Sequence, residues 1–169
     1  MLPKIQPGDI FLTRGESLLG RAIRTAEALW APDGRAEYNH AGFFFCTCPG
    51  ESIEALPNGI TGRRWPEEFR GEKILIARHR EMDPVRFWQG LGRIEMELGE
   101  PYPYHRLLLH LIKPLAEINL LDTYVCSEIV QTFLFFAGLT RDRRGWNPDD
   151  LEEIIWQGDP WRIVWGGVP

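Results

Sequence analysis

Three residues that lie far apart in the chain, Cys126, His40 and Glu54, have the side chains that carry out thiol-dependent acyl chemistry. Cys126 lies in the first turn of an apolar segment with helical spacing. The unpaired amides and the positive dipole end of a helix favour a thiolate over a thiol. The backbone N–H of Cys126 is also a natural donor to an oxyanion on a substrate. The alternative that stays open is a small buried cysteine on a core helix.

His40 and Glu54 supply the acid–base chemistry that such a cysteine needs. His40 is followed by Ala41 and Gly42, which leave room for another segment or a substrate. Glu54 lies among apolar residues, where a carboxylate is costly to bury unless it is paired, and a histidine is the evident partner. His40 would then remove the thiol proton and protonate the leaving group, while Glu54 would orient the imidazole. The plainer interpretations are a hydrogen-bonded histidine at a strand end and a solvated carboxylate.

A hairpin predicted to follow His40 provides a geometric test. His40 and Glu54 share one face of the sheet only if the numbers of paired residues add up to an even value, as with Cys46 opposite Ser52. In the other register Glu54 points to the opposite face, and the triad loses its third member.

Periodicity and turn residues predict the elements that must position these side chains. The predicted strands comprise residues 8–13 (a turn and a short strand), 41–48, 52–56, a short strand from Ile60, 73–78, and an edge strand at 161–165. The predicted helices comprise residues 17–30, 84–98, 107–118 and 123–137, and Pro114 interrupts the third. The predicted N-caps are Ser17 for the first, Asp83 for the second, and Asp122 or Thr123 for the last. Gly99 ends the second helix and Gly138 ends the last. Together they predict an α+β fold, in which a small antiparallel sheet packs on helices.

Length and composition indicate a single globular domain that spans residues 1–169. A hydrophobic fraction of 44% suits a packed core rather than disorder. The formal net charge of -5 gives no attraction to phosphate backbones, which argues against a nucleic-acid partner. The start of the chain lacks the features of a signal peptide, and no apolar stretch reaches the roughly 18 residues that span a bilayer. We therefore expect reduced thiols and a cytoplasmic location, with export without a signal peptide, for example in a phage particle, as the alternative.

No cofactor and no metal site are expected. Zinc takes about four ligands, and Cys46 and Cys48, on one face of a predicted strand, have no second Cys/His pair at metal spacing. His105 and His110 are five residues apart, which is off the spacing of one helix face.

Aromatic residues near the cysteine are secondary candidates for the site. Tyr124 precedes the nucleophile by two residues and is a candidate donor to the substrate or the oxyanion. Tyr102, Tyr104 and His105 are candidates for lining an acyl or peptide pocket, and ordinary packing is the alternative for all four. The run 107–118 is apolar nearly all round, so we expect it to be buried, with a surface that meets lipid as the alternative.

Several short segments carry a resemblance to a known family. They are Gly8-Asp9-Ile10, His40-Ala41-Gly42, Ile53-Glu54-Ala55, Gly99-Glu100-Pro101-Tyr102 and Cys126-Ser127-Glu128. In this order they resemble the permuted NlpC-type hydrolases, the YiiX/YaeF-like branch of the papain-like superfamily, which is related to lecithin retinol acyltransferase. In unpermuted members the cysteine helix precedes the histidine strand, whereas here the histidine comes first. The resemblance extends from Pro7 to Leu151.

The resemblance implies a papain-like fold and a Cys-His-polar triad at Cys126, His40 and Glu54. It also implies attack on amide or ester carbonyls through an acyl-enzyme, with cell-wall peptides, other peptides, N-acylated amino compounds and lipids as substrate classes. The expected function is a cysteine hydrolase that acts on a peptide, N-acyl or lipid-like small substrate. The alternatives are a membrane-associated acyltransferase or lipase-like enzyme on the same fold, and a catalytically inactive binding module.

Overall fold

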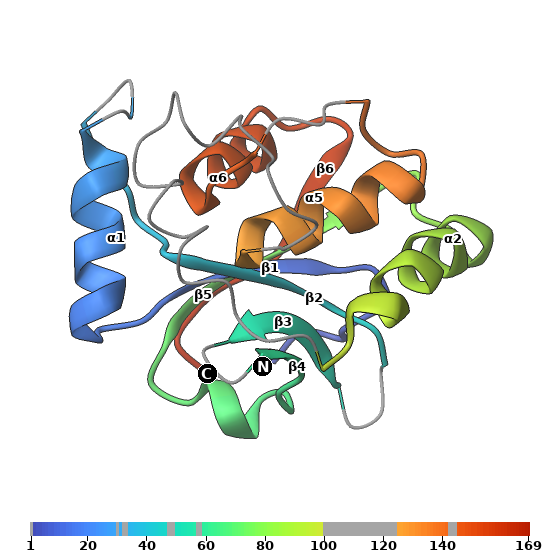
Figure 1. The fold of residues 1–169 in the computed structure, drawn as a ribbon, viewed down its shortest axis with the longest axis horizontal. Coiled ribbons are helices and arrows are strands. Elements are labelled where there is room, and N and C mark those ends of the chain that lie inside the picture. Colours follow the sequence, from blue (N-terminus) through green and yellow to red (C-terminus); the bar gives the residue numbers. More distant parts are fainter. Residues whose placement is uncertain are drawn as a thin grey trace.

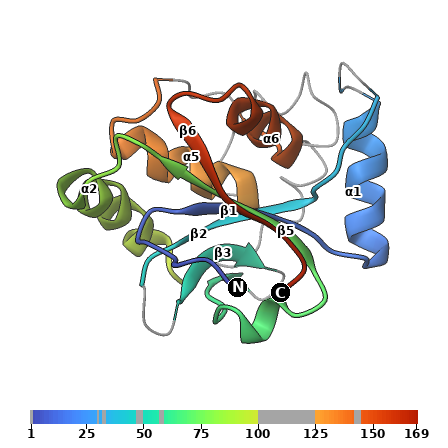
Figure 2. The ribbon, with the colours of Figure 1, turned by 180° about the vertical axis from the view of Figure 1, so that it is seen from behind.

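The computed structural model describes residues 2–29, 31, 34–46, 50–56, 59–99, 125–141 and 145–169. Within these ranges it confirms the predicted α+β fold, an antiparallel sheet packed on helices (Figure 1). Helices α1 and α2 lie at opposite ends of the molecule, and α5 lies between them, in this view and in the view from behind (Figure 2). Helix α5 contacts α2 and the strands β2 and β3, so the cysteine helix packs directly on the sheet.

The sheet has six strands in the order β4-β3-β2-β1-β5-β6, and each neighbouring pair is antiparallel. All of the predicted strands are present, and the last one forms an edge as expected. The strands are β1 (Ile10–Arg14), β2 (His40–Phe44), β3 (Ser52–Leu56), β4 (Gly59–Thr61), β5 (Lys73–His79) and β6 (Trp161–Gly167).

Strand β2 is shorter than the predicted strand 41–48 and ends at Phe44. Beyond this residue the N–H groups of Phe45 and Cys46 both donate to the carbonyl oxygen of Glu51, at 2.9 and 3.4 Å. These bonds close the connection to β3, so the regular ladder stops. The prediction that Cys46 lies on a strand face is therefore wrong.

The described helices are α1 (Leu18–Ala28), α2 (Pro84–Ile94), α5 (Cys126–Phe136) and α6 (Pro148–Trp156), with 3₁₀ turns η1 (Glu67–Phe69) and η2 (Glu95–Glu97). Ser17 and Asp83 cap α1 and α2 as predicted, and their side-chain oxygens accept backbone N–H groups at 3.0 and 2.9 Å. Helix α2 tightens into η2 after Ile94, so the predicted helix 84–98 is α-helical only in its first part. A bilayer-crossing helix would have to be longer and more apolar than any of these described helices.

Helix α6 is an element that the sequence interpretation missed. Its N-cap is Asn147, whose Oδ1 accepts the N–H of Asp150 at 2.7 Å, and Pro148 occupies the first helical position. An N-cap asparagine followed by proline is a recognised helix start. The signal was therefore present in the residues, and helix α6 now covers part of the core next to β6.

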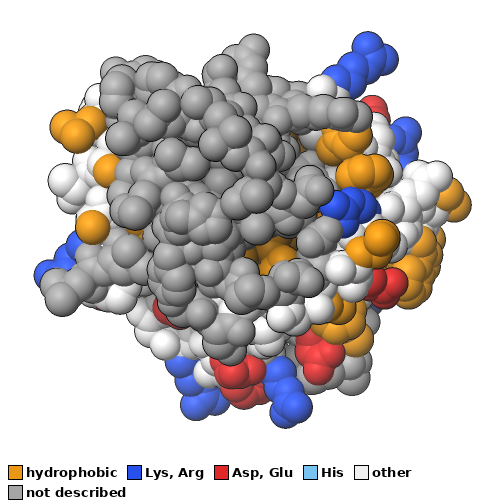
Figure 3. Space-filling model, viewed as in Figure 1, with side chains coloured by type: hydrophobic (Ala, Val, Ile, Leu, Met, Phe, Trp, Pro, Cys, Tyr) orange, Lys and Arg blue, Asp and Glu red, His pale blue; other side chains and the backbone are white. Residues whose placement is uncertain are grey.

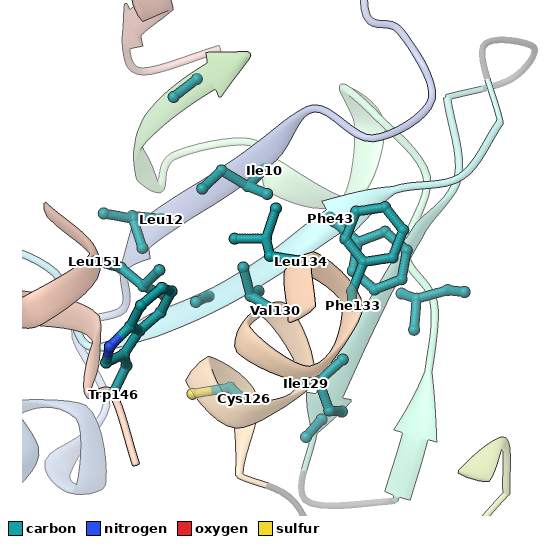
Figure 4. Packing of buried hydrophobic residues seen from close by; sticks show 14 of the residues in the cluster. Ile10, Leu12, Phe43, Cys126, Ile129, Val130, Phe133, Leu134, Trp146 and Leu151 are labelled. Atoms are coloured by element: carbon teal, nitrogen blue, oxygen red, sulfur yellow. The ribbon is translucent and has the colours of Figure 1, made fainter. Parts of the chain in front are cut away.

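Packing on the α5 side of the sheet ties the cysteine helix to the histidine strand. The rings of Phe43 in β2 and Phe133 in α5 are stacked, with centroids 4.1 Å apart and planes 8° apart (Figure 4). His40 begins the strand that holds Phe43, and Cys126 begins the helix that holds Phe133. The stack therefore helps to fix the position of the helix start relative to His40.

The other side of the sheet carries an aromatic cluster next to η1. Phe11 and Phe69 meet edge to face there, with ring centroids 5.2 Å apart. His40 has the strand parity of Phe44, which belongs to this cluster, but as the first residue of β2 it lies at the end of the strand, where it lines one cavity with Cys126. The remaining buried members of the cluster are Ile5, Trp65, Ile74 and Ile76.

Candidate active site

Helix α5 begins at Cys126, so the cysteine lies in the first turn as predicted. The N-cap position belongs to Val125, which corrects the expectation that Asp122 or Thr123 caps this helix. The side chain of Glu128 reaches back instead, and its Oε2 accepts the N–H of Val125 at 3.2 Å. Because valine has no side-chain acceptor, it cannot cap the other amides of the first turn. These amides lie at the positive end of the helix, beside the sulfur.

The thiol of Cys126 is largely buried but borders a cavity. The residue is 6% exposed. Cys126 and His40 line the same cavity, which has a volume of about 170 Å³. Figure 4 shows the sulfur at the start of α5, pointing away from Ile129. A small chemical group in this cavity would meet the sulfur and the imidazole together.

The buried side chain of Asn39 fixes the start of the histidine strand. Its Oδ1 accepts the N–H of Gly15 at 3.0 Å, and its Nδ2 donates to the Gly15 carbonyl at 2.8 Å. The backbone N–H of Asn39 also donates to the carbonyl oxygen of Thr13 at 3.1 Å. These bonds extend the contact between β1 and β2 beyond the pair of Thr13 and His40. The backbone that carries the imidazole is therefore held firmly.

The imidazole of His40 contacts the carboxylate of Glu54, with Nε2 2.7 Å from Oε2. Gly42 pairs with Glu54 in the ladder of β2 and β3, which confirms the even register. The pairing is shifted by two positions from the example of Cys46 opposite Ser52. In the observed register His40 and Glu54 are diagonal neighbours on one face of the sheet.

Two acidic partners hold the imidazole in its charged form. Burial alone would lower the pKa of His40. Negative charge at Cys126 and the hydrogen bonds of the ring to Cys126 and Glu54 outweigh burial and raise the pKa to about 10. Since Nε2 faces Glu54, Nδ1 is the ring nitrogen that remains for the sulfur. The imidazole thus contacts a carboxylate and lies within electrostatic reach of a thiol.

The carboxylate of Glu54 is fully buried and has a donor on each oxygen. Arg63 donates from Nε to Oε1 at 3.0 Å and from Nη2 to Oε2 at 2.9 Å, and the hydroxyl of Ser52 donates to Oε1. Burial acts to raise the pKa of Glu54, but hydrogen bonds and positive charge from His40 and Arg63 lower it to about 2. Glu54 is therefore ionised over the whole physiological pH range.

Sequence reasoning missed Ser52 and Arg63 as members of this site. Ser52 precedes Glu54 by two residues in β3, so both side chains lie on one face. Thr61 pairs with Glu54 across β3 and β4, and Arg63 has the same parity as Thr61. Extending the parity argument beyond the short strand at Ile60 would have placed Arg63 next to Glu54.

A second buried carboxyl group, that of Glu27 in α1, lies within electrostatic reach of the cysteine. Glu27 is 5% exposed, and among the described residues its Oε2 has no hydrogen-bond partner. Burial, followed by negative charge at Cys126 and Asp149, raises the pKa of Glu27 well above its ordinary value. A protonated Glu27 adds no negative charge beside the sulfur.

Asp9 belongs to the segment Gly8-Asp9-Ile10 that contributes to the family resemblance. It stabilises the fold and is not one of the residues that line the cavity. It is buried, and its two oxygens accept bonds from Nε and Nη2 of Arg78 at 2.6 and 2.8 Å. It also accepts the backbone N–H of Gln6 at 2.8 Å. Asp9 therefore joins the start of β1 to β5.

Gly42 leaves no room for a side chain where the histidine strand passes Glu54. A Cβ atom there would lie 2.5 Å from Cζ of Phe11, 2.8 Å from the carbonyl oxygen of Ile53 and 2.9 Å from Cγ of Glu54. We expect Gly42→Ala to lower the free energy of unfolding by about 1–3 kcal/mol, because the neighbours must shift to admit the methyl group. Urea unfolding monitored by tryptophan fluorescence measures this change.

Gly92 in α2 provides the matched control for this substitution. In the described part of the chain, no atom of another element lies within 4 Å of a Cβ atom at this position. Gly92→Ala is therefore expected to raise the free energy of unfolding by about 0.5–1 kcal/mol, since alanine is the better helix former. Equal effects of the two substitutions would contradict the close packing around Gly42.

The secondary candidates of the sequence analysis are not placed by the structure. Tyr102, Tyr104, His105 and Tyr124 lie outside the described residues, as does the run 107–118. Three of the residues weighed as metal ligands, Cys48, His105 and His110, lie outside them. Within the described part of the chain, no group of three or more His, Cys, Asp or Glu side chains could hold a metal ion.

The structure combines a six-stranded antiparallel sheet with a helix that begins at a cysteine, and the histidine strand precedes this helix in the chain. The structure matches the crystal structure of metalloprotein YiiX from Escherichia coli O157:H7 (DUF1105) with a TM-score of 0.65 and 16% sequence identity. The match covers 98% of this chain and 99% of the YiiX chain. Neither a protein-family model nor a curated protein matches the sequence. The predicted YiiX-like fold is thus confirmed, and the likeness is one of fold.

Proposed function

We propose that the chain is a thiol-dependent hydrolase that cleaves an amide or ester bond through an acyl-enzyme. Cys126 is the nucleophile, His40 the general base and acid, and Glu54 orients the imidazole. The observations that carry this proposal are that His40 and Cys126, at the start of α5, line one cavity, and that Nε2 of His40 lies 2.7 Å from the buried carboxylate of Glu54. A nucleophile, its base and an orienting group within contact of one another form the arrangement that covalent catalysis requires.

The proposed reaction begins with a thiolate on Cys126 and a proton on each nitrogen of His40. The thiolate attacks the carbonyl carbon, and first-turn amides of α5 donate to the resulting oxyanion. The imidazolium then gives a proton to the leaving amine or alcohol, and the acyl group remains on the sulfur as a thioester. In the second half the neutral imidazole takes a proton from water, which attacks the thioester and releases the acid. The second step returns the charged imidazole and the thiolate.

The cavity at the sulfur supports a substrate that presents a small group to the triad. Its volume is about 170 Å³. Gly15, Gly20 and Ala55 are among its lining residues, and they leave the space next to His40 open because they have minimal side chains. A space of this size accommodates a short acyl group or one small amino-acid side chain. We therefore propose peptides and N-acylated amino compounds as the first substrate classes to test, ahead of long-chain lipids.

YiiX is described as a metalloprotein, but the donors at the proposed triad do not fit a metal centre. Catalytic zinc sites take about three protein ligands with an open position. In this chain His40 faces Glu54 and Cys126, and the oxygens of Glu54 already accept bonds from Ser52 and Arg63. No metal step therefore enters the proposed mechanism.

Acyl transfer at a membrane is the second candidate function, and an exposed apolar surface favours it. Val85 and Trp88 of α2 are 66% and 64% exposed, and Phe136 at the end of α5 is 46% exposed. Figure 3 shows hydrophobic side chains gathered on the side of the molecule where α2 lies. The guanidinium of Arg93 lies 6.0 Å from the ring of Phe136. Aromatic side chains next to a cation suit the boundary between lipid headgroups and acyl chains.

A panel of chromogenic substrates separates these functions. The purified protein would be incubated with p-nitrophenyl acetate, p-nitrophenyl octanoate and an N-acetyl-peptide p-nitroanilide, with and without anionic liposomes. A hydrolase releases product and carries an acyl adduct in the intact-protein mass without vesicles. A membrane acyltransferase needs the vesicles and passes the acyl group to an added acceptor. If no substrate gives an adduct or product under either condition, both proposals are wrong and a binding module remains.

A further inference from the structure

We propose that Arg63 is a positioning residue that keeps the carboxylate of Glu54 ionised and directed at Nε2 of His40 in both protonation states of the imidazole. This inference rests on the proposed function, because it adds a fourth member to the same triad. Arg63 follows the edge strand β4, far along the chain from both His40 and Cys126. Its task would be to let His40 lose a proton without leaving a buried carboxylate unpaired.

The contact between Arg63 and Glu54 has the geometry of a two-pronged ion pair. Nε of Arg63 lies 3.0 Å from Oε1, and Nη2 lies 2.9 Å from Oε2 of the same carboxylate. The side chain of Arg63 is 15% exposed and that of Glu54 is 0% exposed. A planar guanidinium that meets a carboxylate with two parallel bonds fixes the orientation of the carboxylate as well as its charge. Oε2 is therefore held toward His40.

The guanidinium of Arg63 is itself held on its other sides. Its centre lies 4.0 Å from the ring centroid of Phe69, a buried member of the aromatic cluster. Nη1 donates to Oε1 of Glu72 at 2.7 Å and to the carbonyl of Glu68 at 3.4 Å. These contacts occupy Nη1, which faces away from Glu54. The remaining edge, Nε and Nη2, is presented to the carboxylate in a fixed orientation.

Catalysis by the proposed triad makes this arrangement necessary. When the imidazolium gives its proton to the leaving group, His40 becomes neutral and Glu54 loses one of its two cationic partners. A buried carboxylate without a cation tends to take up a proton, so Glu54 would compete with the leaving group for the proton of the imidazolium. With Arg63 in place, the carboxylate keeps a positive partner through the acyl-enzyme stage. His40 is then free to cycle between its charged and neutral forms.

The charged and polar groups that face these residues fix the direction of the expected effect. Cys126 and Glu54 face His40; His40, Ser52 and Arg63 face Glu54; and Glu72 faces Arg63. Among the described residues, the imidazolium would be the one cation left beside Glu54 without Arg63. Loss of Arg63 should therefore raise the pKa of His40, because Glu54 would interact more strongly with the protonated imidazole. If Arg63 only supported the fold, its loss would instead lower the pKa of His40, because a loosened Glu54 carboxylate binds the imidazolium less well.

The test is an NMR titration of His40 in protein that carries Cys126→Ala, so that neither turnover nor the thiolate contributes. In this background Arg63→Gln is expected to raise the titration midpoint of the imidazole by about one pH unit or more. Arg64→Gln is the matched control, since Arg64 is the adjacent arginine and is exposed, and we expect it to leave the midpoint unchanged. A midpoint that is unchanged in Arg63→Gln, or that falls toward the ordinary value of 6.5, would overturn the proposal.

A second measurement keeps Arg63 in place and so does not depend on whether Arg63→Gln folds. In His40→Ala, Arg63 is the remaining cation beside Glu54, and the carboxyl carbon of Glu54 can be followed by ¹³C NMR. We expect Glu54 to stay ionised at every pH above its ordinary value of 4.5. Uptake of a proton near neutral pH would show that Arg63 is not sufficient and would overturn the proposal. Neither measurement needs turnover, so failure of the hydrolase proposal and failure of this one remain distinguishable.

Discussion

Replacement of Cys126 by alanine is expected to abolish the acyl adduct and to reduce kcat by about 10⁴-fold or more. His40 and Glu54 would remain in contact in this variant, but they would have no nucleophile to activate. The side chain lost is small and borders a cavity, so the folded state should persist. Intact-protein mass spectrometry and the release of p-nitrophenol measure the two effects, and circular dichroism confirms the fold.

Cys46 provides the matched control for this substitution. It is a half-buried cysteine beyond the end of β2, on a segment that does not belong to the triad. Cys46→Ala should retain the adduct and the turnover of the unchanged protein. An adduct that persists in Cys126→Ala and maps to Cys46 or Cys48 would show that the nucleophile has been assigned to the wrong cysteine.

Glu54→Gln is expected to have the second largest effect, and it should act on both activity and stability. Turnover should fall by about 10²–10⁴-fold, because the amide neither orients the imidazole nor stabilises its charged form as a carboxylate does. The pKa of His40 should fall from its value of about 10, since one of its two acidic partners is lost. The free energy of unfolding should drop by about 3–5 kcal/mol, because the buried ion pairs of Glu54 with His40 and with Arg63 are both broken and Arg63 keeps only Glu72 as a partner.

The pH dependence of stability checks the same assignment without a substrate. The pKa of Glu54 is about 2 in the folded chain against an ordinary 4.5, so its contribution is complete above pH 4.5 and is lost as the pH falls toward 2. The pKa of His40 is raised from 6.5 to about 10, so its contribution is complete below pH 6.5 and is lost as the pH rises through 10.

Thermal unfolding across this pH range should show a loss of stability at acid pH and another at alkaline pH in the unchanged protein. In Glu54→Gln the loss of stability at acid pH should be much smaller. Glu67→Gln is the control, because Glu67 is an exposed carboxylate at the start of η1. It should change the free energy of unfolding by less than about 0.5 kcal/mol. If Glu54→Gln loses as much stability at acid pH as the unchanged protein does, the ionised, buried state of this carboxylate is contradicted.

The local part of the site could be predicted from the sequence because its signals lie close together in the chain. His40 and Glu54 belong to one hairpin, so strand parity alone decides whether they share a face, and the observed pairing of Gly42 with Glu54 has the required parity. The position of Cys126 in the first turn followed from the apolar periodicity of the helix behind it. The caps Ser17 and Asp83 follow from residue type.

The remaining features depend on contacts that cannot be predicted from the periodicity of the sequence. Arg63 reaches Glu54 only because β4 pairs with β3 and the chain then continues beyond the strand. The early end of β2 depends on two amides that share the carbonyl of Glu51. The start of α5 at Cys126, rather than at 123, depends on the reach of Glu128 back to Val125. Each of these is a choice between local alternatives that the tertiary fold decides.

The most direct test of the proposed triad is the rate at which iodoacetamide alkylates Cys126 as a function of pH, followed by peptide mapping, in the unchanged protein and in His40→Ala. An imidazolium–thiolate pair predicts a rate in the unchanged protein that is already high at about pH 5 and nearly constant to about pH 8. In His40→Ala the rate should instead rise about tenfold per pH unit toward pH 8.5, as for an ordinary thiol. If both proteins follow the same rising curve, His40 does not activate Cys126 and the hydrolase proposal is contradicted.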